Sequence, residues 1–154
     1  MATLTRRGHW RSERGAELVE MALVLPVLLL VIVGIIEFGF MFQRFLVLTN
    51  AANEGARVAI LPSYSAGDAE ARAIAYAVQS GVPAGTVTAV MTPGINLTEG
   101  ARCAQGRRVT VTHTYQFQYI NPIAAMFGPT LAQITLTGRS TMREQGPSVV
   151  GACP

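Results

Sequence analysis

The sequence has few charged residues and no lysine. Only 14% of its 154 residues are charged, whereas half are hydrophobic. This composition is too apolar for a disordered chain and leans toward the membrane class. All twelve basic residues are arginine and the formal net charge is only +3, so the charge balance gives no indication of nucleic-acid binding.

The residues from which catalytic sites are built are also scarce. The chain has two histidines, His9 and His113, and a single aspartate, Asp68. We expect His113 to be a half-buried residue on the apolar face of a strand, without a catalytic partner. The sequence contains no phosphate-binding glycine loop, nucleophile elbow or acidic metal cluster. We therefore expect no enzyme activity, no cofactor and no metal site.

Only two cysteines are present, Cys103 and Cys153. They are separated by fifty residues with no nearby histidine pair, which does not resemble a zinc site. Both follow the apolar segment described below, so they would lie on the same side of a membrane. One disulfide between them is possible if that side is oxidising, and two free thiols are the alternative.

Hydrophobic residues are concentrated in one run. Met21 to Ile36 contains no charged side chain, and after Glu37 the apolar run resumes to Phe42. At 1.5 Å per residue, about 20 residues span a hydrocarbon core of about 30 Å, so we expect Met21 to Phe42 to form a transmembrane helix. Pro26 should kink or loosen that helix.

Basic residues cluster before this span and not after it. The leader carries four arginines, whereas only Arg44 lies close on the other side. The positive-inside rule then places the N-terminus in the cytoplasm and exports the rest of the chain. The leader arginines are Arg6, Arg7, Arg11 and Arg14.

Beyond the span, the pattern predicts an α+β fold. The helix should continue to about Leu61, since Phe45, Leu48, Ala52, Ala56 and Ala59 recur at helical spacing. Ser65 and Asp68 form a capping box for a short second helix, whose apolar face would be Ala71, Ile74, Ala75 and Val78. An antiparallel sheet of about three strands should follow, over Thr86–Met91, Arg108–Tyr119 and Ile134–Met142. The chain divides into a leader (1–15), the long helix (16–61) and an exported domain (62–154).

The residues just before the span carry a specific motif. Gly15 is followed by Ala16 and, five positions after the glycine, by Glu20 at the mouth of the apolar helix. This resembles the processing site of type IV prepilins. With Leu25–Pro26, the stretch GIIEFG (34–39) and the stretch NAANEGAR (50–57), residues 12 to 61 resemble the TadE family of pseudopilins.

The resemblance implies a function in assembly. It implies a minor pseudopilin of the Flp type IVb pilus, or tight-adherence secretion apparatus, held in the bacterial inner membrane with its C-terminal domain periplasmic or extracellular. A prepilin peptidase would cut between Gly15 and Ala16. The other partners would be the major pilin, further pseudopilins and membrane lipid, without nucleic acid.

Two acidic residues have alternative interpretations. Glu20 could pair with the new amino terminus of an adjacent subunit during assembly, or merely mark the membrane boundary. Glu37 could contact another helix of the assembly, or reach toward water at the outer interface.

Two other functions are consistent with the same sequence. One is an uncleaved, membrane-anchored protein that binds an envelope component. The other is a soluble secreted domain released by signal peptidase near Thr49–Ala51, although the apolar run is longer than a signal core of 7 to 15 residues.

Overall fold

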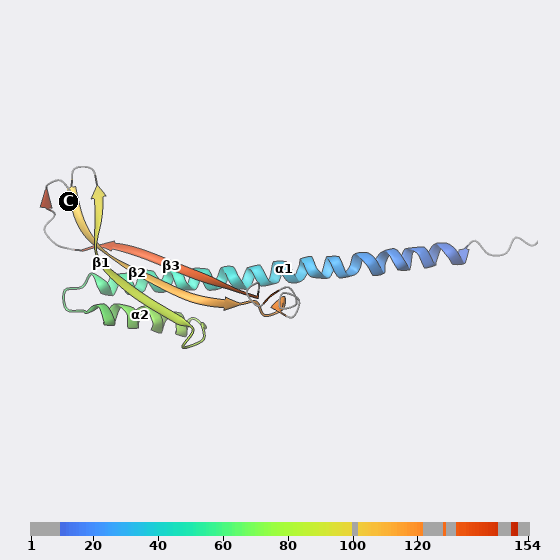
Figure 1. The fold of residues 1–154 in the computed structure, drawn as a ribbon, viewed down its shortest axis with the longest axis horizontal. Coiled ribbons are helices and arrows are strands. Elements are labelled where there is room, and N and C mark those ends of the chain that lie inside the picture. Colours follow the sequence, from blue (N-terminus) through green and yellow to red (C-terminus); the bar gives the residue numbers. More distant parts are fainter. Residues whose placement is uncertain (1–9, 100–101, 122–127, 129–131, 145–148, 151–154) are drawn as a thin grey trace, which may run out of the picture.

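The structure is a computed structural model that describes residues 10–99, 102–121, 128, 132–144 and 149–150. It combines one long helix, one short helix and an antiparallel sheet, which confirms the expected α+β class (Figure 1). The elements are α1 (Trp10–Ala59), α2 (Ala66–Gln79), β1 (Val87–Glu99), β2 (Arg102–Gln116), β3 (Gln133–Arg143) and β4 (Val149–Val150).

Helix α1 has two differently packed parts. Its N-terminal part extends away from the rest of the structure as a bare rod, whereas its C-terminal part lies along the sheet and beside α2 (Figure 1). The helix continues through Pro26 without a break. The C-terminal part buries Leu48, Ala52, Ala56 and Ala59 as the spacing predicts, whereas Phe45, which shares that spacing, is exposed. Helix α1 therefore forms part of the core of the folded domain.

Helix α2 begins where the capping box places it. The Ser65 hydroxyl accepts a hydrogen bond from the Asp68 backbone N–H (3.3 Å), and the Asp68 carboxylate accepts one from the Ser65 backbone N–H (2.8 Å). Reciprocal bonds of this kind satisfy two of the free donors at a helix start. After the helix, Gly81 has a φ of 89°, a left-handed conformation that glycine adopts without strain.

The buried face of α2 differs from the expected one. Its fully buried residues are Ala69, Ala73 and Ala77, whereas in the predicted face Ile74 and Val78 are half-buried and Ala71 and Ala75 are exposed. The reason is the close approach of α1, where a Cβ added to Gly55 would lie 2.9 Å from the Ala69 carbonyl oxygen and from the Ala73 Cβ. A side chain larger than alanine would not fit opposite Gly55 at that separation.

The sheet has the order β1-β2-β3, with β4 also paired to β2. All three pairings are antiparallel. Val109, Val111 and His113 of β2 face the helices and are buried, as the alternation predicts. The predicted boundaries are wrong for β1 and β2, because β1 continues past Met91 to Glu99 and pairs there with an earlier part of β2.

The sheet and α1 lie very close together at Gly138 of β3. A Cβ at this position would overlap the backbone of Leu48 and lie 2.7 Å from the Thr49 nitrogen. A glycine is therefore required for β3 to rest directly on the helix backbone.

Candidate functional site

The residues of the predicted processing motif lie on the bare part of α1. Gly15, Ala16 and Glu20 are helical and exposed, and a Cβ added to Gly15 would meet no atom within 4 Å. The helix is long and apolar enough to cross a membrane. A single-pass membrane anchor fits these properties.

Glu37 ends this bare part and is fully buried. Its Oε1 accepts hydrogen bonds from the Gln118 backbone N–H (2.6 Å) and the Tyr115 hydroxyl (3.2 Å), and its Oε2 accepts one from the Tyr119 backbone N–H (2.9 Å). Three donors compensate the carboxylate for the loss of water. We call Glu37 and these three partners the Glu37 latch.

The latch corrects both interpretations of Glu37. Its carboxylate neither reaches toward water nor is free to contact another helix. Three donors at the end of the chain's own sheet already form hydrogen bonds with it. The latch also explains why β2 ends at Gln116 and not at Tyr119: the backbone N–H groups of Gln118 and Tyr119 turn toward Glu37. Burial, together with the nearby Glu37 charge, raises the pKa of the Tyr115 hydroxyl.

The latch also changes the expected membrane span. The predicted span, Met21 to Phe42, includes residues that lie beside the folded domain. From Ala16 to Ile36 almost all residues are exposed, and only Val33 and Gly34, close to Glu37, are half-buried. About 21 residues form about 31 Å of helix, which matches a hydrocarbon core of about 30 Å.

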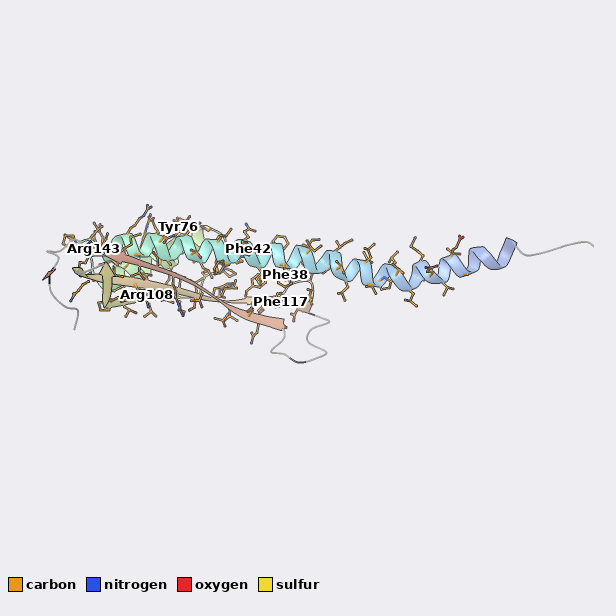
Figure 2. The ribbon with its side chains drawn as sticks, turned by 90° about the horizontal axis from the view of Figure 1, so that it is seen from above. Phe38, Phe42, Tyr76, Arg108, Phe117 and Arg143 are labelled. Carbon is orange, nitrogen blue, oxygen red and sulfur yellow. The ribbon has the colours of Figure 1, made fainter. Side chains whose placement is uncertain are left out.

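On the C-terminal side of Glu37, the face of α1 that is turned away from the folded domain carries exposed apolar side chains. They recur at helical spacing and range from 38% exposed for Phe45 to 61% for Phe38. The rings of Phe42 and Phe45 are in contact, with centroids 6.2 Å apart. Figure 2 shows Phe38 and Phe42 where the bare helix joins the folded domain. We call Phe42, Phe45 and Leu46, which follow Phe38 on this face, the outer stripe.

A groove of about 610 Å³ lies beside the latch, between α1, β2 and the loop that follows α2. Arg44 and His113 are among its lining residues. The Arg44 guanidinium donates a hydrogen bond to the Gly81 carbonyl, and His113 Nδ1 lies 3.2 Å from the Thr86 carbonyl oxygen. Both side chains thus have structural contacts. Within the described residues, no group of histidine, cysteine, aspartate and glutamate could hold a metal ion.

Cys153 lies outside the described residues, and no disulfide is found among those that are described. The backbone of Cys103 lies in β2, opposite Val149 of β4. The pairing of β4 with β2 therefore brings the C-terminal part of the chain beside the strand that carries Cys103.

The bare helix, its N-terminal glycine and the chain that follows it can be compared with known proteins. Residues 15–57 match the model of the TadE-like protein family. The match confirms the resemblance to the TadE family over residues 15–57 and suggests a protein associated with the Tad pilus. The TadE-like segment begins at Gly15, includes the Glu37 latch residue and ends two residues before the end of α1. No curated protein and no solved structure matches the chain.

Sequence reasoning missed three members of the latch. Tyr115, Gln118 and Tyr119 lie within a strand pattern that gives no sign of a contact with Glu37, from which they are separated by 78 to 82 residues. The only available signal is Glu37 itself, because a carboxylate within an apolar helix requires compensation.

Proposed function

We propose that this protein is a minor pseudopilin that acts in the assembly of a Flp pilus or tight-adherence apparatus. The observation that carries the proposal is the TadE-like match, which begins at Gly15, the residue that precedes the expected cleavage point. A prepilin peptidase cuts between Gly15 and Ala16 and removes the arginine-rich leader. The protein acts in assembly and not in catalysis.

The bare helix supports a function for Glu20 within the membrane. If Ile36 marks the outer edge of the hydrocarbon core, about 20 residues of helix bring the inner edge to about Glu17. Glu20 then lies about 4.5 Å inside the core, where an unpaired carboxylate is costly. In this proposal its partner is the amino group of Ala16 on an adjacent subunit, which exists only after cleavage.

The outer stripe supports helix packing outside the membrane. Phe42, Phe45 and Leu46 are exposed on α1, above the level of the bare segment. Scattered exposed apolar residues are ordinary, but an aligned row that continues a transmembrane helix is typical of a helix–helix contact. The partners are the major pilin and other pseudopilins, whose helices emerge from the same membrane.

The packing of α1 argues against a secreted domain released near Thr49–Ala51. Cleavage there would separate Leu48, which is fully buried, from the sheet on which it packs. It would also remove Glu37 and its three hydrogen bonds. The domain depends on the part of α1 that signal peptidase would discard.

Mass spectrometry of the N-terminal peptide, from protein purified from native membranes, tests the proposal. Gly15→Ala is compared with Gly34→Ala, because an added Cβ meets nothing within 4 Å at either position. We expect the wild type and Gly34→Ala to begin at Ala16, and Gly15→Ala to retain Met1. A wild-type chain that retains Met1 would favour an uncleaved anchor, and a start near Ala52 would favour a secreted domain.

A further inference from the structure

We propose that the membrane-proximal rim of the folded domain, formed by Phe38, Phe40 and Tyr119, rests in the lipid headgroup layer of the outer face of the membrane. The inference relies on insertion of α1 in the membrane, as in the proposed function, and adds the lipid surface as a direct partner of the domain. We call these three residues the aromatic rim.

The Glu37 latch fixes the position of the folded domain along α1. The backbone nitrogens of Gln118 and Tyr119 lie 2.6 and 2.9 Å from the carboxylate of Glu37. Glu37 is fully buried. If the domain moved along α1, the carboxylate would lose these hydrogen bonds. The end of β2 therefore stays at the level of Glu37.

The bare helix leaves no room between the domain and the lipid. Ala16 to Ile36 forms about 31 Å of helix, which the hydrocarbon core of about 30 Å takes up completely. Lifting the domain by one helical turn would expose apolar side chains of α1 to water, and lowering it would bury the backbone of the rim in lipid. The rim is therefore held at the headgroup layer.

The side chains of the rim suit that layer. Phe38, Phe40 and Tyr119 are all exposed, and the rings of Phe40 and Tyr119 are in contact, with centroids 6.3 Å apart. Between Glu37 and Arg44 the helix carries no charged residue. Tyrosine in particular is enriched at membrane interfaces, because its ring is apolar and its hydroxyl can reach water.

The geometry of the rim favours lipid over a single protein partner. Phe38 and Phe40 are two positions apart on α1, which places them about 200° apart around the helix axis. One flat protein surface would cover only one of these rings. A bilayer surrounds the helix and contacts both.

Tryptophan fluorescence in vesicles tests the contact with lipid. The full chain, with its natural Trp10 changed to Phe, is reconstituted at a low protein-to-lipid ratio in phosphatidylcholine vesicles. The phosphatidylcholine carries bromine near the glycerol end of its acyl chains. Single tryptophans are then introduced as Tyr119→Trp at the rim, Phe38→Trp on the helix, and Tyr64→Trp at the distal end of the domain, where Tyr64 is also exposed.

We expect bromine to quench the tryptophans at positions 119 and 38, with blue-shifted emission, and to leave position 64 unquenched. Quenching at 38 but not at 119 would overturn the proposal while leaving insertion of α1, and so the proposed function, intact. Quenching at none of the three would also overturn the rim, and co-flotation of the protein with the vesicles then shows whether α1 is still inserted. Circular dichroism of each variant establishes that the fold is retained.

Discussion

The Tyr115 hydroxyl donates a hydrogen bond of 3.2 Å to the carboxylate of Glu37, a residue 78 positions earlier in the chain. The bond joins the last part of β2 to the point where α1 leaves the folded domain. It places a polar contact at the boundary between the lipid-facing and domain-facing parts of one continuous helix. Substitutions can separate the parts of this contact, because one donor is a side-chain hydroxyl and the other two are backbone N–H groups.

Substitution of Glu37 should destabilise the attachment of the sheet to α1. Glu37→Ala leaves the N–H groups of Gln118 and Tyr119 without an acceptor, so we expect a loss of about 2–4 kcal/mol of unfolding free energy. Tyr115→Phe removes only a hydroxyl and should cost about 1 kcal/mol. Thermal unfolding in detergent, monitored by circular dichroism, shows which of the two variants loses more stability. Equal effects of the two changes would contradict the latch.

The contact between β3 and α1 should not accept a methyl group at Gly138. Its added Cβ would overlap the Leu48 backbone, which cannot move as a side chain can. We expect Gly138→Ala to cost about 3 kcal/mol, the range of severe overpacking. Gly39→Ala is the matched control, because its Cβ meets no atom within 4 Å. The same detergent unfolding assay compares the two, and a stable Gly138→Ala variant would show that β3 does not pack this closely.

The start of α2 should weaken in acid. The hydrogen bonds from Ser65 lower the pKa of Asp68, so the carboxylate stabilises the fold above its ordinary pKa, and this stabilisation is lost as the pH falls through the lowered value. Arg72 likewise lowers the pKa of Glu54, which adds the same sign of pH dependence elsewhere. Melting temperature below about pH 5 should therefore fall less steeply in Ser65→Ala than in the wild type. Parallel curves would exclude the capping box as the cause.

Glu20 and Glu17 should behave differently in assembly. Both are exposed carboxylates at the start of the bare helix, but only Glu20 has the spacing from Gly15 that the prepilin resemblance requires. We expect Glu20→Gln to be cleaved normally and to lose most pilus assembly, whereas Glu17→Gln retains it. Electron microscopy of surface pili, with immunoblots for the processed protein, distinguishes the two. Equal assembly by both variants would leave Glu20 as a boundary residue.

Cys103 and Cys153 remain a predicted disulfide. A bridge between them would close a loop of about 50 residues and stabilise the domain by about 4 kcal/mol through the unfolded state. Peptide mapping without reductant, on protein from native membranes alkylated at lysis, should recover the two cysteines in one linked peptide. Recovery of both as alkylated thiols would exclude the bridge.

Some elements could be predicted because their signals are local. The capping box at Ser65 and Asp68 uses residues three positions apart, and the alternation of β2 from Arg108 onward repeats every second residue. The apolar run likewise predicts its own helix, because a segment of this length and hydropathy has no other stable form in lipid.

Other features depended on contacts between distant segments. The predicted buried face of α2, formed by Ala71, Ile74, Ala75 and Val78, was wrong, because the close approach of Gly55 places Ala69 and Ala73 against α1 instead. The C-terminal end of β2 was also predicted wrongly. The backbone N–H groups of Gln118 and Tyr119 donate hydrogen bonds to Glu37, so they do not continue the strand.

The sequence alone determined the apolar helix, the α+β class and the resemblance to the TadE family from Gly15 onward, because the signals for each lie in neighbouring residues. Only the tertiary structure decided where the domain begins on the helix. That boundary is set by Glu37, whose burial is tolerable solely because the end of a strand about 80 residues away supplies three hydrogen-bond donors.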